Sequence, residues 1–145
     1  MKNIAILGAG TMGKGIALSF AAGGYKVELF DNSEAARANA LPSIKSDLDL
    51  MAEMGAITEE TASAALGNIT IHDDMIATSV NADFLIEVVP EILSLKQDIF
   101  AELDKVCKPE CIFASNTSSL KLDDMMAKLS DSRKQRTMID RKSVV

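Results

Sequence analysis

Three glycines near the N-terminus have the spacing of a phosphate-binding loop. They lie in the run Gly8-Ala9-Gly10-Thr11-Met12-Gly13, which follows the short apolar stretch 3–7 and opens a helical pattern. In such a loop the first glycine allows a tight turn, the second lets a diphosphate approach the backbone, and the third lets helix and strand pack closely. The unpaired N–H groups and the dipole of the helix N-terminus then attract the anion. We therefore expect a dinucleotide cofactor to contact Gly8, Gly10, Thr11, Met12 and Gly13.

An acidic residue completes this pattern. Asp31 lies 18 residues after Gly13, just past a second apolar stretch, and is followed by Asn32 and Ser33 rather than by an arginine. A carboxylate at this place accepts hydrogen bonds from the adenosine ribose and repels the 2′-phosphate of NADP. The sequence therefore predicts an NAD site. Two alternatives stay open: the glycines serve a turn while Asp31 caps the next helix, or the loop binds FAD, which uses the same pattern.

Apolar stretches alternate with helical patterns along the chain, which is the order of a parallel sheet with helices on both faces. The expected strands are 3–7, 25–30, 69–72, 84–89 and 111–114. The expected helices are 12–22, 33–54, 58–67, 93–106 and 121–129, with a turn or short helix over 73–80. The alternation predicts an α/β fold with a Rossmann-like, doubly wound, mainly parallel sheet.

The region 33–67 is expected to be a helical hairpin inserted between strands. Ser33 and Thr58 are the expected N-caps of its two helices, and Pro42 should kink or restart the first of them. After Ser130 the sequence becomes polar and basic, and no element is predicted there.

Composition narrows the function classes. The chain has 145 residues, enough for one domain, and a net charge of −6, which argues against nucleic acid as a partner. It has no apolar run of about 18 residues, so we expect no membrane segment and a cytoplasmic protein. Cys107, Cys111 and His72 do not have the number and spacing of ligands that a metal site needs, so we expect no metal, two reduced cysteines and a structural histidine.

The chain resembles, over residues 1 to about 130, the N-terminal domain of the 3-hydroxyacyl-CoA dehydrogenases, a group that includes 3-hydroxybutyryl-CoA dehydrogenase. The most specific stretch is Asn116-Thr117-Ser118-Ser119 after an apolar strand. The other stretches that carry the resemblance are 3–13, the hairpin, 82–91, 95–104 and 114–120.

The resemblance implies an NAD-dependent oxidoreductase of fatty-acid metabolism, which oxidises the 3-hydroxyl of a short-chain acyl-CoA to a ketone. By position, Ser118 resembles the catalytic serine that hydrogen-bonds the reacting oxygen, and Asn116 lines the same pocket. Glu91 and Lys96 resemble residues that contact the nicotinamide half of the cofactor. Lys45, on the hairpin, resembles a contact for the CoA phosphates. From the residues alone, Ser118 could instead be a helix N-cap, and Glu91 and Lys96 a solvated pair.

The sequence departs from the family after residue 130. The family's general base is a histidine in a His-Phe-Phe-Asn-Pro-like strand, and the stretch 136–145 contains no such motif. We interpret 131–145 as a non-matching tail and expect the helical C-terminal domain of the family to be absent. Two alternatives are a truncated or frameshifted dehydrogenase and a stand-alone NAD-binding module, either as a homo-oligomer or completed by another helical domain. In both cases we expect little turnover by this chain alone.

Overall fold

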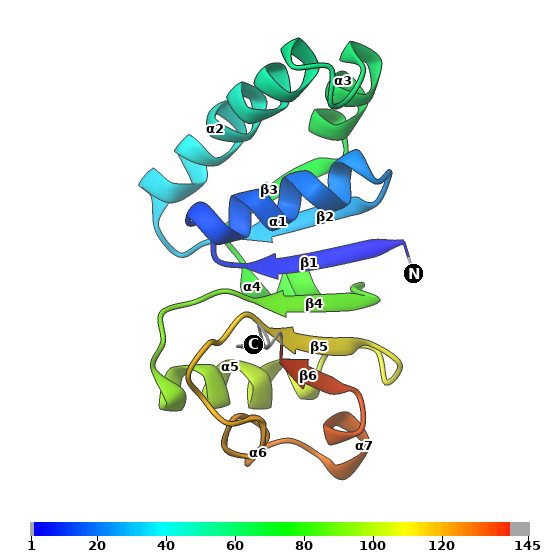
Figure 1. The fold of residues 1–145 in the computed structure, drawn as a ribbon. Helices are drawn as coiled ribbons and strands as arrows, with labels where there is room; N and C mark the ends of the chain where they lie inside the picture. Colours follow the sequence, from blue (N-terminus) through cyan, green and yellow to red (C-terminus); the bar gives the residue numbers. More distant parts are fainter. Residues whose placement is uncertain (1, 140–145) are drawn as a thin grey trace, which may run out of the picture.

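A six-stranded parallel sheet forms the centre of the computed structural model, which describes residues 2–139 (Figure 1). The strand order is β3-β2-β1-β4-β5-β6, so the chain leaves β1 outward in one direction and returns to extend the sheet in the other. Each neighbouring pair is parallel, which confirms the doubly wound, Rossmann-like α/β fold. The strands are β1 (Asn3–Leu7), β2 (Lys26–Phe30), β3 (Ile69–His72), β4 (Phe84–Glu87), β5 (Ile112–Ser115) and β6 (Thr137–Ile139).

Helices connect successive strands, and two of them begin at the expected caps. The Ser33 hydroxyl accepts a hydrogen bond from the N–H of Ala36, and the Thr58 hydroxyl accepts one from the N–H of Thr61. None of the helices described over residues 2–139 has both the length and the apolar character to cross a bilayer. The helices are α1 (Thr11–Ala22), α2 (Glu34–Glu53), α3 (Glu59–Gly67), α4 (Met75–Ser79), α5 (Leu93–Asp104), α6 (Leu122–Met125) and α7 (Asp131–Lys134).

The predicted hairpin is formed by α2 and α3, which pack against each other and against α1. Its buried side chains are mostly small, including Ala40, Ala62 and Ala65, so the helices can approach closely. Pro42 lies inside α2, which runs on as one helix, so the expected restart is wrong. Pro42 has no N–H, so the carbonyl of Ala38, four residues earlier, has no hydrogen-bond donor within the helix. Ala38 is exposed, so water can donate to this carbonyl instead.

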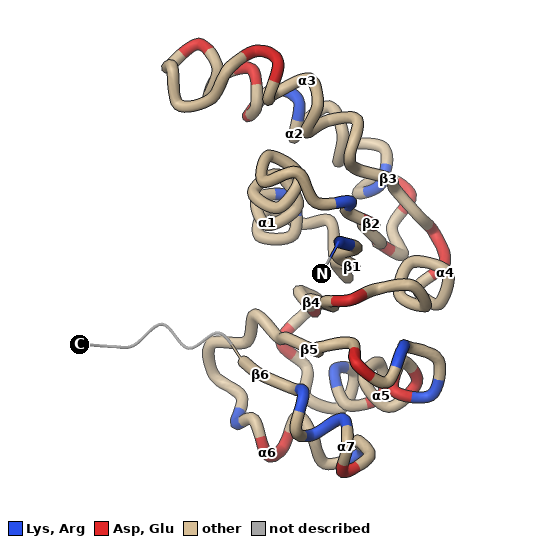
Figure 2. The backbone as a smooth tube through the Cα atoms, turned by 90° about the vertical axis from the view of Figure 1, so that its right-hand side faces the viewer, with Lys and Arg blue, Asp and Glu red and all other residues tan. Residues whose placement is uncertain are grey.

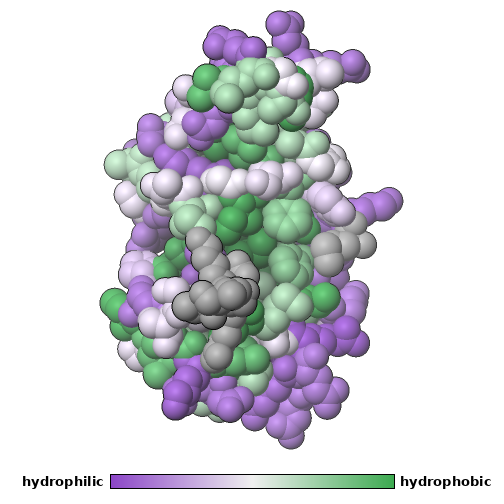
Figure 3. Space-filling model, viewed as in Figure 1, coloured by the Kyte–Doolittle hydropathy of each residue, from purple (hydrophilic) through white to green (hydrophobic). Residues whose placement is uncertain are grey.

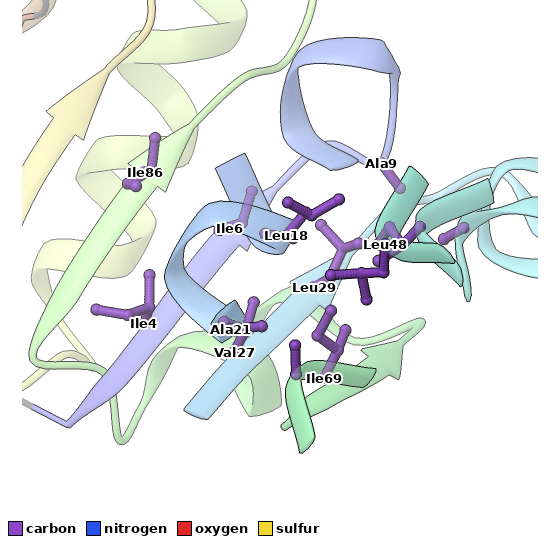
Figure 4. Packing of buried hydrophobic residues seen from close by; sticks show 14 of the residues in the cluster. Ile4, Ile6, Ala9, Leu18, Ala21, Val27, Leu29, Leu48, Ile69 and Ile86 are labelled. Atoms are coloured by element: carbon purple, nitrogen blue, oxygen red, sulfur yellow. The ribbon is translucent and has the colours of Figure 1, made fainter. Parts of the chain in front are cut away.

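The two faces of the sheet bury separate apolar clusters, because alternate residues of a strand point to opposite sides. Ile4 and Ile6 of β1 belong to the cluster that includes residues of α1, α2 and α3. Figure 4 shows Ile6 beside Leu18 of α1. Ala5 and Leu7 point the other way and pack with α5 and α6. Figure 3 shows hydrophobic residues gathered on the α1 side, at the centre of the face seen in Figure 1.

Residues 131–139 contain two elements where none was expected: α7, and β6, which pairs with β5. The polar, basic composition of this segment predicted no packed element, but one of its cations, Arg133, is buried. The Arg133 side chain is 3% exposed, its guanidinium carbon lies 4.3 Å from the centre of the Phe113 ring, and its Nε lies 2.9 Å from the Asp104 carboxylate. It also donates to the carbonyl oxygens of Cys111 and Lys108. These bonds hold α7 against α5 and bring β6 to the sheet. Residues 140–145, which include the rest of the interpreted tail, lie outside the described residues.

Candidate functional site

The carboxyl ends of β1, β4 and β5 meet at one edge of the sheet, where ligands bind in open α/β folds. The glycine loop follows β1 there, and backbone hydrogen bonds hold it to its neighbours. Gly8 N–H donates to the Phe30 carbonyl at the end of β2 (2.7 Å), and Val88 N–H donates to the Leu7 carbonyl (2.9 Å). Asn116 N–H donates to the Glu87 carbonyl in the same way (3.0 Å), so the segments after β1, β2, β4 and β5, which carry the predicted site residues, are fixed next to one another.

The three glycines have different physical roles. Gly8 has φ +116°, and a Cβ there would lie 2.8 Å from the Val88 carbonyl oxygen. A Cβ on Gly13 would lie 1.8 Å from the Gly8 carbonyl oxygen. Both positions thus exclude a side chain within the protein. A Cβ on Gly10, in contrast, would meet nothing within 4 Å. Gly10 faces open space at the start of α1, which is where a diphosphate would approach the backbone.

Asp31 lies beside this loop, with its carboxylate held by two backbone N–H groups. Ala9 N–H donates to Oδ2 and Ser33 N–H donates to Oδ1, each at 2.8 Å. Asp31 also lines a cavity of about 620 Å³ together with Gly8 and Gly10. The carboxylate is thus oriented towards the glycine loop before any ligand binds.

A second cavity, of about 290 Å³, lies on the other side of the loop. It shares Gly10, Val88 and Val89 with the first cavity and is also lined by Glu91 and Asn116. Two neighbouring cavities that meet at a glycine suit an elongated ligand with a charged middle.

A buried ion cluster supports this second cavity. Lys96 Nζ lies 3.0 and 3.1 Å from the two carboxylate oxygens of Glu87 and 3.3 Å from Glu91 Oε2. Lys96 is 1% exposed and Glu87 is 0% exposed, so Lys96 is not part of a solvated pair. Glu87 also accepts hydrogen bonds from Val89 N–H and from the Ser115 hydroxyl, both at 2.6 Å.

Sequence reasoning missed Glu87 as a site residue, although a signal was present. A single glutamate interrupts an apolar strand that lies inside a parallel sheet, where both faces are buried. Such a carboxylate needs a cation and further donors. Lys96, one turn into the next helix, is that cation.

Glu91 joins the cluster to the loop after β5. Its carboxylate accepts hydrogen bonds from the Thr117 and Ser119 hydroxyls. Burial raises the pKa of Glu91, but the Thr117 hydrogen bond and the charge of Lys96 outweigh it and hold the pKa below its usual value. Ser118 lies exposed in the same loop, and the following helix, α6, has Lys121 as its N-cap residue. Ser118 is therefore not a helix cap.

Lys45 lies apart from these residues, on the hairpin. Its Nζ is 2.6 Å from Asp49 Oδ2 and its side chain is 59% exposed. The neighbouring cavity between α2 and α3, about 450 Å³, is also lined by Glu53 and Glu59. Figure 2 shows the acidic residues at this end of the hairpin. A CoA phosphate at Lys45 would have to replace Asp49 as its partner.

The contacts of the histidine and of the two cysteines indicate structural roles. His72 hydrogen-bonds to the Glu28 side chain on the neighbouring strand β2. Cys107 and Cys111 are free and buried. The contact with Cys107, together with burial, raises the pKa of the Cys111 thiol and keeps it protonated and unreactive.

Comparison with known proteins gives a consistent result. The sequence model of the family described as "3-hydroxyacyl-CoA dehydrogenase, NAD binding domain" matches residues 3–139. The chain is 38% identical over 128 residues to the probable 3-hydroxybutyryl-CoA dehydrogenase of Bacillus subtilis, covering 88% of this chain and 44% of that protein. It is 34% identical over 132 residues to the 5-formyl-3-hydroxy-2-methylpyridine 4-carboxylate 5-dehydrogenase of Mesorhizobium japonicum, covering 90% of this chain and 41% of that protein.

The fold is also similar to solved structures. The crystal structure of (S)-3-hydroxybutyryl-CoA dehydrogenase from Ralstonia eutropha superposes with a TM-score of 0.87 at 32% identity, covering 96% of this chain and 48% of that one. The chain thus spans less than half the length of these relatives.

Proposed function

Because the chain belongs to the family of NAD-binding domains of 3-hydroxyacyl-CoA dehydrogenases, we propose that it is the cofactor-binding part of an oxidoreductase acting on short-chain 3-hydroxyacyl-CoA. The reaction would oxidise the 3-hydroxyl group to a ketone, with NAD as the hydride acceptor. The observation that carries the proposal is the open space over Gly10, between two cavities lined by Asp31 on one side and Glu91 on the other.

In this proposal the two cavities hold the two halves of NAD. Asp31 accepts hydrogen bonds from the adenosine ribose, and the backbone of Gly10, Thr11, Met12 and Gly13 holds the diphosphate. Glu91 contacts the nicotinamide half. The Nζ of Lys96 already faces three carboxylate oxygens of Glu87 and Glu91, so its role is to fix Glu91.

Ser118 and Asn116 are the proposed residues for the acyl-CoA substrate. Asn116 lines the cavity beside Glu91, and Ser118, which is exposed, lies two residues further along the same loop. A serine hydroxyl placed at the reacting oxygen stabilises the negative charge that develops on it when the ketone is reduced. Lys45, on the hairpin, is the proposed contact for the CoA phosphates.

The relatives differ in the substrates that their names state. One relative is named for a pyridine carboxylate rather than an acyl-CoA, so the family's cofactor domain serves more than one substrate class. Since the chain covers under half of its relatives, we propose that a helical domain completes the substrate site, in the same chain, in a partner or in a homo-oligomer.

The single histidine, His72, is on β3 and paired with Glu28 rather than at the site. A missing general base typically costs about 10²–10⁴-fold in rate. We therefore expect the 145-residue chain to bind NADH but to turn over slowly or not at all. The alternative function is an NAD-binding module without chemistry.

Two measurements test these proposals. Calorimetric titration with NADH, repeated with NADPH, should give saturable binding of NADH and much weaker binding of NADPH. NADH oxidation with acetoacetyl-CoA should be near background for the chain alone, and Ser118→Ala should then leave NADH affinity unchanged. Equal affinity for both cofactors would refute the role of Asp31 in selecting NAD. Rapid NADH oxidation by the chain alone would refute the proposal that its catalytic site is incomplete.

A further inference from the structure

We infer that Thr117 is a positioning residue that, through Glu91, couples the cofactor cavity to the loop 116–120, which carries the proposed substrate residues Asn116 and Ser118. The inference rests on the proposed contact between Glu91 and the nicotinamide half of NAD. It gives a role to a residue that needs no ligand contact of its own, and it implies that the cofactor and the acyl-CoA strengthen each other's binding.

The first observation is that one side chain belongs to both parts of the site. Glu91 lines the cavity of about 290 Å³ together with Gly10 and Asn116, and its side chain is 40% exposed. The same carboxylate accepts hydrogen bonds from the hydroxyls of Thr117 and Ser119 in the loop after β5. A group that restrains Glu91 from the cavity therefore also acts on this loop.

The second observation is the central place of Thr117 in the loop. Thr117 is 1% exposed, whereas Ser118 and Ser119 next to it are exposed. Its hydroxyl donates to Glu91, and its Oγ1 accepts the N–H of Leu120 at 3.1 Å. One buried oxygen thus joins the carboxylate to the loop backbone. Because the chain turns between Thr117 and Leu120, this oxygen fixes the turn that presents Ser118.

The carboxylate of Glu91 can hold the loop and a ligand at the same time. An ionised carboxylate has about four acceptor positions. Thr117 and Ser119 donate to Oε1, and Lys96 Nζ lies 3.3 Å from Oε2. An acceptor position on Glu91 is thus left for a donor group of the cofactor. A cofactor bound there restrains Glu91 and with it the loop, and by linkage the bonds of the loop strengthen cofactor binding to the same extent.

The test is a double-mutant cycle on the NADH affinity of the 145-residue chain, measured by calorimetry for wild type, Glu91→Ala, Thr117→Val and the double variant. Valine keeps the shape of threonine but removes the hydroxyl, so the cofactor must order Glu91 on binding. We expect Thr117→Val to weaken NADH binding at least about fivefold when Glu91 is present, the lower end of the usual coupling between two sites. Once Glu91 is alanine, the same change should weaken binding by less than about twofold.

Two controls accompany the cycle. Thr117→Ser keeps the hydroxyl and should bind NADH within about twofold of wild type. Thr78→Val makes the same chemical change at another buried threonine, which is 2% exposed, donates to the Asp74 carbonyl and lines neither of the cavities that meet at Gly10. It should also leave NADH affinity within about twofold of wild type.

A second measurement uses the wild-type chain alone. Hydrogen exchange of the Leu120 amide, followed by NMR, reports on its bond to Thr117. The matched reference is the amide of Thr61 on the hairpin, which donates to Thr58 Oγ1 at 3.0 Å. Saturating NADH should slow the exchange of Leu120 at least about fivefold and leave that of Thr61 unchanged.

The outcomes separate this inference from the proposed function. Equal weakening by Thr117→Val with and without Glu91, or none in either case, would overturn the role of Thr117. A loss in Thr117→Ser or Thr78→Val as large as that in Thr117→Val would do the same, as would Leu120 exchange that NADH leaves unchanged. Unchanged NADH affinity in Glu91→Ala would instead overturn the placement of the nicotinamide half.

A folded wild-type chain that binds no NADH would overturn the proposed function itself. Should Thr117→Val or Glu91→Ala not fold, as judged by circular dichroism, the exchange of Leu120 in wild type decides.

Discussion

Replacing Lys96 with methionine should be among the most damaging changes outside the apolar core. Methionine keeps most of the side-chain volume but removes an amine that lies 3.0 and 3.1 Å from the oxygens of Glu87. Glu87 is fully buried and would keep Val89 N–H and the Ser115 hydroxyl as donors, but no positive charge. Removing one partner of a buried ion pair costs about 3–5 kcal/mol, because the other charge stays buried. That is a large part of the total stability of a domain, about 5–15 kcal/mol.

A second variant, Glu87→Gln/Lys96→Met, separates the charge from the loss of packing. Glutamine keeps the shape of Glu87 and an acceptor for Val89 N–H, and the double variant buries no unpaired charge. We therefore expect it to be more stable than Lys96→Met by at least about 2 kcal/mol, since most of the cost is the uncompensated charge.

The assay is urea unfolding followed by circular dichroism, because the chain contains no tryptophan. Equal slopes against urea must first show that the variants unfold in the same two-state manner. A loss of less than about 1 kcal/mol in Lys96→Met would refute the reasoning that the cluster is a buried ion pair on which the site depends. A double variant no more stable than Lys96→Met would show that packing, not charge, sets the cost.

Two further predictions follow from the same geometry. Gly13→Ala should destabilise the fold by about 1–3 kcal/mol and abolish NADH binding, because the new Cβ would lie 1.8 Å from a backbone oxygen. Gly10→Ala should change stability by under about 0.5 kcal/mol and still weaken NADH binding, because its Cβ would meet nothing within 4 Å. Similar urea midpoints for the two variants would contradict this. The hydrogen bond from Lys108 and those from the N–H groups of Lys2 and Asn3 hold the pKa of Asp83 well below its usual range, so this carboxylate stabilises the fold above about pH 4 and loses its effect as pH falls through the folded-state pKa. Asp83→Asn should thus be less stable than wild type at pH 7 but closer to it at low pH in urea unfolding, and a constant difference across pH would refute the assignment.

Local pattern was sufficient to predict the centre of the fold and where the glycine loop and Asp31 lie. The glycine spacing, the apolar stretch before it and Asp31 depend on residues close in sequence, so the loop, α1 and the end of β2 could be predicted. The caps Ser33 and Thr58 were found for the same reason, since a side chain bonds a backbone three residues away.

Features that depend on distant residues could not be predicted in this way. β6 has only three residues, Thr137–Ile139, too few to show a strand pattern, and it pairs with β5 next to the place where Arg133 binds Asp104 and the carbonyl of Cys111. The role of Glu87 likewise depends on Ser115, 28 residues away, which the sequence alone does not bring to it. The helix expected over 121–129 is shorter than predicted: α6 covers only Leu122–Met125, and the turn that follows brings Leu129 into the core.

The anchoring of the glycine loop has a consequence for the thermodynamics and kinetics of binding. The N–H groups of Gly8, Ala9 and Val88 donate hydrogen bonds to the Phe30 carbonyl, the Asp31 carboxylate and the Leu7 carbonyl, respectively. These bonds fix the conformation of the loop within the protein itself. Ordering a free residue costs about 1–2 kcal/mol of conformational entropy, and here that cost is met during folding rather than on binding. Association should therefore be a single-phase encounter without a slow ordering step, and the entropy lost should come mainly from the cofactor, whose two halves must be brought into line across Gly10.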